Sequence, residues 1–209
     1  MTYAFDANTG KVKWEREAHK GAPFGGRHRK NTFASETPAT DGERLYPYFG
    51  NVGLFAYSLD GTPLWSTRFD PQPMYLDFGT AASPVVVDGR VFVVHDNEGR
   101  SFGAAVDART GKLLWRSERD IKAPQGSGWS SPFVWATEGA DGTEQKELIV
   151  VGRQHAISYD PENARCDRGR AVTSRLPRAR KATRMWRGSI RAHQPTHHRR
   201  SSTADECTW

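Results

Sequence analysis

The segment Ala105–Trp115 reads A-V-D-A-R-T-G-K-L-L-W, and the chain repeats it. Residues 4–14 read A-F-D-A-N-T-G-K-V-K-W, with Ala, Asp, Thr-Gly-Lys and Trp at the same offsets. Residues 54–65, L-F-A-Y-S-L-D-G-T-P-L-W, carry the same phrase with a turn shorter by one residue. The closing tryptophans stand at positions 14, 65 and 115, so the phrase returns after 51 and then 50 residues. A repeat period of this length is typical of propellers and solenoids.

Each copy of this phrase predicts a β-hairpin. Apolar residues precede an aspartate, a glycine then occupies a turn position where a positive φ costs little, and an alternating segment ends in tryptophan. A second hairpin phrase precedes two of the copies, with Asp41-Gly42 or Asp88-Gly89 at its turn. A looser copy of it lies between Ser131 and Val151. Two hairpins per period give four antiparallel strands, which is one blade of a β-propeller.

The phrase A-x-D-x-x-T-G-x-x-x-W, alternating with S-P-x-x-x-D-G, resembles the pyrroloquinoline-quinone-type (PQQ-like) repeat. Quinoprotein dehydrogenases and BamB-like outer-membrane assembly propellers carry this repeat. The resemblance covers residues 1–163 and implies an all-β propeller of four-stranded antiparallel blades. Because such propellers include enzymes, scaffolds and sensors, the motif identifies the blade and leaves the activity open. The resemblance assigns structural roles to the glycine and tryptophan of each copy, namely Gly10, Trp14, Gly61, Trp65, Gly111 and Trp115.

The repeats predict two complete blades flanked by two partial ones. Residues 2–17 supply only an outer hairpin, complete blades are expected over about 33–69 and 80–118, and a further blade begins near Trp129. A closed propeller of the resembling class has seven or eight blades and needs roughly 350–400 residues. We therefore expect an open arc of about three to four blades, as a truncated fragment of a larger propeller whose end blades expose apolar faces.

Charge and composition change abruptly after residue 163. The chain has 209 residues and a formal net charge of +6, but residues 164–209 alone contain 12 Lys plus Arg against 3 Asp plus Glu. The preceding residues are slightly acidic, with 18 basic and 21 acidic side chains. Valine, leucine and isoleucine occur only three times after residue 163. Such a segment buries too little apolar surface to offset its ordering entropy, so we expect a disordered, Arg-rich tail over 164–209.

Three explanations of this tail are open. We favour an out-of-frame product of GC-rich coding sequence, because the motif requires Gly at 164 and Trp at 168, where Ala164 and Arg168 stand. A genuine basic tail that binds nucleic acid or acidic lipid is the second explanation. The third is a metal site, which lacks any familiar ligand spacing. Its ligands would come from Cys166, His193, His197, His198 and Cys207.

Candidate binding residues follow from the resemblance. Ligands of such propellers bind over the central channel, which is lined by the segments leading into each innermost strand, here 27–36, 75–83 and 125–131. The arginines of the first segment suit the carboxylates of a quinone or of an acidic partner. Asp77 and Glu36 have the chemistry of calcium ligands or bases, and Trp129 that of a support for a flat cofactor. The candidate set is Arg27, Arg29, Asn31, Asp77 and Trp129, and ordinary solvated loops are the alternative interpretation.

The leading functional hypothesis is a non-catalytic BamB-like module that binds protein or a small ligand at the channel face, with no catalytic residue, metal or cofactor. The resemblance implies an extracytoplasmic parent. The alternative is part of a PQQ-dependent dehydrogenase of alcohols or sugars, which would use PQQ with calcium. The chain has no adjacent cysteine pair, as many such enzymes have, and Asp96–Gly99 favours a β-turn over a metal loop. Nucleic-acid binding through the tail ranks third.

Two further expectations concern the membrane and export. No apolar run in the sequence approaches the roughly 20 residues of a membrane-spanning helix. Met1 opens directly into a repeat, so we expect no secretory signal within this chain.

Overall fold

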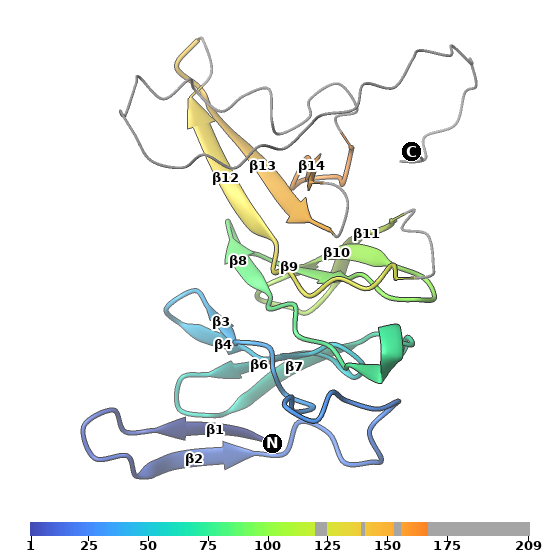
Figure 1. Ribbon diagram of the computed structural model, residues 1–209. Helices are drawn as coiled ribbons and strands as arrows, with labels where there is room; N and C mark the ends of the chain where they lie inside the picture. Colours follow the sequence, from blue (N-terminus) through green and yellow to red (C-terminus); the bar gives the residue numbers. More distant parts are fainter. Residues whose placement is uncertain (120–124, 139–140, 153–155, 167–209) are drawn as a thin grey trace, which may run out of the picture.

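The computed structural model describes residues 1–119, 125–138, 141–152 and 156–166, and the expected tail lies almost wholly outside these ranges. The described residues form β-strands and one short 3-10 turn, η1 (Tyr75–Asp77). The strands make four antiparallel sheets that follow one another along the chain, and Figure 1 shows these sheets stacked in sequence order. This is the expected all-β arrangement of successive propeller blades.

Each sheet uses a contiguous stretch of sequence. The first sheet contains β1 (Thr2–Phe5) and β2 (Val12–Arg16). The second contains β3 (Ala39–Thr40), β4 (Arg44–Tyr46), β5 (Tyr48–Phe49), β6 (Gly53–Ser58) and β7 (Pro63–Arg68). The third contains β8 (Val85–Val87), β9 (Arg90–His95), β10 (Phe102–Asp107) and β11 (Leu113–Glu118). The fourth contains β12 (Phe133–Glu138), β13 (Glu144–Val151) and β14 (Ala156–Tyr159).

The third sheet is a complete blade. Its strands pair in the order β8-β9-β10-β11, each with its neighbour in sequence. The turn between β8 and β9 is Asp88-Gly89, with φ of 49° and 71°. Positive φ at both central residues is the mark of a type I′ turn, whose twist matches that of the paired strands. The local Asp-Gly signal therefore predicted both the hairpin and its position.

The second sheet is a blade with one interrupted strand. Pro47 separates β4 from β5, because proline has no backbone N–H to donate to the ladder. The carbonyl of Pro47 still accepts a hydrogen bond from Phe55 N at 3.0 Å, so both pieces remain beside β6. Five short strands thus build a four-stranded blade. The first and fourth sheets have two and three strands in the described part of the chain, which agrees with the expected partial arc.

The hairpin turn of the fourth sheet continues past residue 163. Asp160 N donates to Arg165 O at 2.8 Å and Ala164 N donates to Asp160 O at 2.9 Å. The same two bonds, with the same lengths, close the turn that begins at Asp107 in the third sheet. Ala164 takes the place of the motif glycine at a φ of 60°, a conformation that costs a residue with a Cβ atom about 1–2 kcal/mol.

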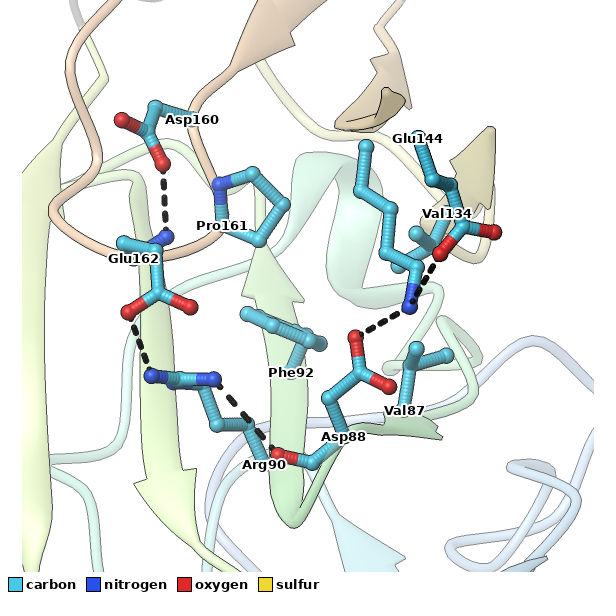
Figure 2. A pocket seen from close by; sticks show the side chains of 10 residues that line it. Val87, Asp88, Arg90, Phe92, Val134, Glu144, Asp160, Pro161 and Glu162 are labelled. Atoms are coloured by element: carbon cyan, nitrogen blue, oxygen red, sulfur yellow. Dashed lines mark hydrogen bonds and ion pairs between the residues drawn. The ribbon is translucent and has the colours of Figure 1, made fainter. Parts of the chain in front are cut away.

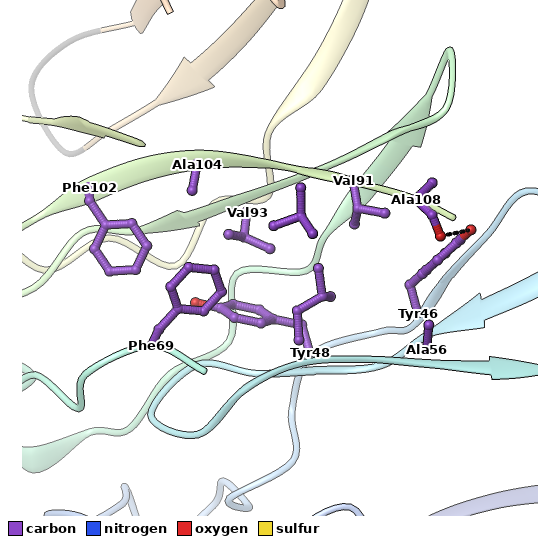
Figure 3. Packing of buried hydrophobic residues seen from close by; sticks show 11 residues of the cluster. Tyr46, Tyr48, Ala56, Phe69, Val91, Val93, Phe102, Ala104 and Ala108 are labelled. Carbon is purple, nitrogen blue, oxygen red and sulfur yellow. Dashed lines mark hydrogen bonds between the residues drawn. The ribbon is translucent and has the colours of Figure 1, made fainter. Parts of the chain in front are cut away.

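Apolar cores lie between neighbouring sheets. Alternate residues of β9 face opposite ways, so that Val91 and Val93 pack against the second sheet while Phe92 and Val94 pack against the fourth. Figure 3 shows the first of these cores, where Tyr48 of β5 and Phe69, the residue after β7, meet the third sheet. Each interior blade therefore buries both of its faces.

The repeat tryptophans connect one sheet to the next. The indole N–H groups of Trp14, Trp65 and Trp115 donate to Leu59 O, Ala108 O and Pro161 O at 3.0, 3.1 and 2.9 Å. A Cβ atom added to Gly61 or Gly111 would lie 2.6 Å from the indole ring of Trp14 or Trp65. Each of these glycines thus meets two demands at once, a positive φ and a close contact with the preceding blade.

Candidate functional site

The connections that lead into the second, third and fourth sheets meet at one end of the blades. Asn31 Nδ2 and His28 N both lie 3.2 Å from Phe78 O and donate to it. Trp129 Nε1 donates to Gly79 O at 2.8 Å from the other side. The peptide groups at residues 78 and 79 therefore hold both neighbouring connections. We call residues 25–36, 75–80 and 125–131 the loop cluster.

Asp77 packs at the centre of the loop cluster. It is the last residue of η1 and has a φ of 54°, a left-handed conformation that aspartate tolerates better than most residues. A Cβ atom added to Gly26 would lie 2.8 Å from the Cβ atom of Asp77, and one added to Gly25 would lie 3.4 Å from Asp77 Oδ1. The double glycine thus permits the backbone to approach Asp77, whose side chain remains exposed.

All five candidate binding residues lie in the loop cluster. Arg27 Nη1 donates to Asn31 O at 2.9 Å, and its guanidinium carbon lies 5.7 Å from the centre of the Phe33 ring. Asn31, Asp77 and Trp129 meet around residues 77–79, although no hydrogen bond between described residues joins one of these side chains directly to another. Trp129 is 38% exposed and its ring centre lies 6.3 Å from that of Phe78. Arg29 is exposed on the same connection.

Glu36 has a structural set of partners. It is buried, and its Oε1 accepts from Thr80 Oγ1 at 2.5 Å and from Gly50 N at 3.1 Å. These bonds tie the first connection both to the turn of the second blade and to the next connection. A buried carboxylate that already accepts from two donors is poorly placed to serve as a calcium ligand or a free base.

Hydroxyl groups of the Ser/Thr-Pro phrases form a second link between connections. Thr37 N donates to Ser83 Oγ at 2.8 Å, and Ser83 N donates to Ser131 Oγ at 2.9 Å. Each hydroxyl therefore accepts from the preceding blade, one repeat earlier in sequence. The repeated Ser/Thr-Pro dipeptide is a sequence signal for these hydrogen bonds. Which group donates and which accepts becomes clear only from the way the blades pack.

The segment Asp96–Gly99 connects β9 to β10 as a turn and supports the loop cluster. Asn97 is fully buried and its Oδ1 accepts from Gly99 N at 2.8 Å. Glu98 accepts from Gln125 N at 2.8 Å and from Ser127 N and Oγ at 2.9 and 2.8 Å. Burial raises the pKa of Glu98, but these hydrogen bonds outweigh it and lower the pKa below its usual value. Glu98 therefore orients the connection that carries Trp129.

A buried ion pair lies beside this turn and escaped the sequence reasoning. Arg119 Nε donates to Asp96 Oδ1 at 2.6 Å and Arg119 Nη2 to Asp96 Oδ2 at 3.1 Å. Arg119 Nη1 donates to Tyr159 Oη at 2.5 Å, which links the third sheet to the fourth. The Arg119 and Asp96 side chains are 0% and 3% exposed. Burial lowers the pKa of Arg119, but Asp96 outweighs it and keeps the guanidinium charged.

His95 is expected to make folding sensitive to acid. It is 3% exposed, neither ring nitrogen has a hydrogen-bond partner, and burial followed by the charge of Arg116 lowers its pKa from 6.5 to about 4. Below pH 6.5 the unfolded chain gains a proton at His95 while the folded chain stays neutral. The free energy of unfolding should therefore fall by up to about 3 kcal/mol between pH 6.5 and 4.

The His95→Phe variant is the matched control, because Phe49 holds the corresponding place in the second blade. Urea unfolding at pH 7 and pH 4 should show a smaller loss of stability for this variant than for the natural chain. Equal losses would mean that other groups cause the acid sensitivity.

No three His, Cys, Asp or Glu side chains gather into a possible metal site within the described ranges. Among those same residues, no helix has the length and apolar character needed to cross a bilayer.

The sheets, their inter-blade tryptophan bonds and the recurring hairpin turns define a β-propeller built from PQQ-type repeats. A family described as outer membrane protein assembly factor BamB matches residues 2–196. The chain belongs to this family.

The chain is similar to proteins of known sequence and to proteins of known structure. A polyvinylalcohol dehydrogenase of a Sphingopyxis species is 27% identical over 186 residues, which cover 76% of this chain and 27% of that protein. BamB from Moraxella catarrhalis has a similar structure at a TM-score of 0.42 and 14% identity, covering 76% of this chain and 39% of that one. A quinohemoprotein alcohol dehydrogenase from Pseudomonas putida matches at a TM-score of 0.42 and 17% identity, covering 78% and 38%. The chain spans about a quarter of the length of the curated relatives it matches.

Proposed function

We propose that the chain is a non-catalytic binding module of a longer, extracytoplasmic BamB-like propeller, and that the loop cluster binds an acidic segment of a partner protein. The supporting observation is that different side chains of the loop cluster hold the backbone and present charge. Asn31 and Trp129 use their N–H groups to hold the backbone at residues 78 and 79, whereas the charged ends of Arg27 and Arg29 are on an exposed connection. The cluster is therefore a rigid support for a positive surface.

Charge favours an anionic partner at this surface. Residues 27–30 read Arg-His-Arg-Lys, and Arg27, Arg29 and Lys30 are all exposed. Arginine offers a planar fork of donors that matches a carboxylate. Because Arg27 is already held by its bond to Asn31 O and its contact with Phe33, it loses little rotamer entropy when a partner binds.

The double variant Arg27→Gln, Arg29→Gln is expected to weaken binding of fluorescein-labelled deca-glutamate about five- to tenfold at low salt. Fluorescence anisotropy with the full chain measures the effect. The control is Arg109→Gln, Lys112→Gln, which removes the same charge from an exposed turn between β10 and β11, at the other end of the blades. If both double variants lose affinity equally, or the natural chain does not bind the probe, the loop cluster is not an anion-binding surface.

A second candidate function is supported by the names of two relatives. Both matched curated relatives are polyvinylalcohol dehydrogenases. A quinone would supply the redox chemistry, and Arg27 and Arg29 are chemically suited to its carboxylates. The described residues gather no three-ligand metal site for the accompanying calcium, so we assign no reaction step to them. In this alternative the catalytic residues belong to other blades of the parent protein.

Reconstitution separates the two candidates. PQQ and calcium are added to the full-length parent, and dye reduction is followed with polyvinyl alcohol and small alcohols as substrates. The binding-module proposal predicts no turnover above the cofactor alone, and reproducible turnover would overturn it in favour of the dehydrogenase.

The boundary between the repeats and the Arg-rich segment is placed after residue 163. We propose that residues 164–209 derive from a shifted reading frame, although the family match extends to residue 196 and the hairpin turn extends through Arg165. The nucleotide sequence provides the test. An alternative frame after codon 163 should encode the missing Gly-Lys-x-x-x-Trp phrase and a further Ser-Pro and Asp-Gly phrase.

A further inference from the structure

A pocket of about 270 Å³ lies between the third and fourth sheets, next to the Asp88-Gly89 turn. It is at the opposite end of β9 from the loop cluster, because β9 begins at Arg90 and ends at His95 beside the Asp96 turn. Figure 2 shows its lining, with Phe92 and Pro161 across the middle and charged side chains on both sides. No residue of the loop cluster lines it.

The repeat shows how this interface differs from the preceding one. Tyr46 of the second blade and Phe92 of the third occupy corresponding places, each about 6 Å from its own blade's tryptophan ring, Trp65 or Trp115. The Tyr46 hydroxyl lies 3.1 Å from Ala108 O in the next blade, beside the indole N–H that bonds the same carbonyl.

Phe92 has no hydroxyl group. The carbonyl equivalent to Ala108 O is Pro161 O, and within the part of the chain that the structure describes it accepts a hydrogen bond from Trp115 Nε1 alone. The hydroxyl group that lies between the second and third blades therefore has no counterpart between the third and fourth, where the pocket lies.

The pocket has an apolar floor and an acidic rim. Val87, Phe92, Val134 and Pro161 supply the apolar surface. Four carboxylates face two cations, and both cations are already paired within the rim. Arg90 Nη2 bonds Glu162 at 2.5 Å, while Lys146 Nζ bonds Asp88 at 2.6 Å and Glu144 at 3.2 Å. The acidic residues are Asp88, Glu144, Asp160 and Glu162.

We infer that this pocket receives an arginine side chain from a partner polypeptide. The alkyl stem lies against Val87, Phe92 and Val134, and the guanidinium meets a rim whose four carboxylates outnumber its two cations. A guanidinium suits this setting better than a neutral or anionic group, because it binds carboxylates through several donors and also stacks on aromatic rings. The volume accommodates one such side chain and a short length of backbone, which argues for a single anchoring residue.

The test is an NMR titration of the full chain with N-acetyl-arginine amide. We expect saturable binding with a dissociation constant on the order of 1 mM, since small ligands of this size bind weakly. N-acetyl-citrulline amide has nearly the same shape without the charge, and it should bind at least fivefold more weakly. Equal affinity for the two ligands, or no binding of either, would overturn the inference.

Two kinds of variant locate the site. Phe92→Tyr introduces the hydroxyl that Tyr46 already carries at the preceding interface, so it should fold, narrow the pocket at its apolar floor and weaken arginine binding. Asp88→Asn, Glu144→Gln should weaken binding about fivefold, and asparagine tolerates the φ of 49° at position 88. The control Glu43→Gln removes one exposed charge from the matching hairpin turn of the second blade. Arginine binding that persists unchanged in Phe92→Tyr would place the ligand elsewhere and refute the assignment.

Discussion

Trp65→Ala is expected to lower the free energy of unfolding by about 3–5 kcal/mol, the range for truncating a large aromatic side chain in a core. The indole packs against the core between the second and third sheets, lies 5.9 Å from the Tyr46 ring centre and bonds Ala108 O. Urea unfolding followed by circular dichroism measures the change. Trp65→Phe keeps most of the ring and should cost about 1–2 kcal/mol, for one hydrogen bond and some contact area.

The motif glycines test the same contact from the other side. Gly111 has a φ of 74°, and an added Cβ atom would lie 2.6 Å from the Trp65 ring. Gly10 has a φ of 69° in the same motif, but an added Cβ atom meets nothing within 4 Å. In both alanine variants the left-handed backbone should lower the free energy of unfolding by about 1–2 kcal/mol. In Gly111→Ala the overlap with the ring should lower it by about 1–3 kcal/mol more. Equal costs would show that the indole contributes nothing at this interface.

Hairpin positions could be predicted because turn chemistry is local. Asp88-Gly89 specifies a turn with two positive φ values, and the alternation on each side specifies which residues of β9 face each neighbouring sheet. The break at Pro47 could also be predicted, because proline has no backbone N–H group. The sequence did not show that Phe55 N, on another strand, donates to Pro47 O and so keeps both pieces of the broken strand in the sheet.

The loop cluster was predictable in location and not in detail. A shared end of the blades brings Asn31, Asp77 and Trp129 together, as expected for segments that lead into successive inner strands. Their bonding depends on backbone carbonyls at residues 78 and 79, and no hydrophobic period specifies the conformation of an irregular connection. Asn31 and Trp129 thus donate their side-chain N–H groups to backbone carbonyls. Residue type alone did not distinguish this structural role from ligand binding.

Long-range polar pairs were the main features that sequence reasoning missed. Asp96 and Arg119 are 23 residues apart, and Arg119 holds the position that Phe69 occupies after the tryptophan of the preceding copy. An arginine in place of a phenylalanine at one repeat position is a signal of an altered inter-blade contact. Its partner becomes evident only when the turn after β9 is placed beside the end of β11.

Arg119→Met is expected to destabilise the chain by about 3–5 kcal/mol, because it leaves Asp96 buried without a counter-charge. Both side chains are almost completely buried, and two of the three hydrogen bonds from the guanidinium go to the Asp96 carboxylate. Replacement with methionine preserves much of the side-chain length, so lost packing contributes less than the unpaired charge. Urea unfolding gives the loss of stability, and a loss below about 1 kcal/mol would show that solvent reaches Asp96.

The double variant Arg119→Met, Asp96→Asn separates unpaired charge from lost structure. It removes both charges and keeps a polar side chain of the same shape at position 96, so it should be more stable than Arg119→Met by about 1–3 kcal/mol. The same comparison reaches the loop cluster, because Gly128 N donates to Asp96 O at 3.1 Å next to Trp129. Hydrogen exchange at Gly128 should rise in Arg119→Met and fall back in the double variant. If exchange rises equally in both, the bond to Tyr159, and not the charge of Asp96, orders this connection.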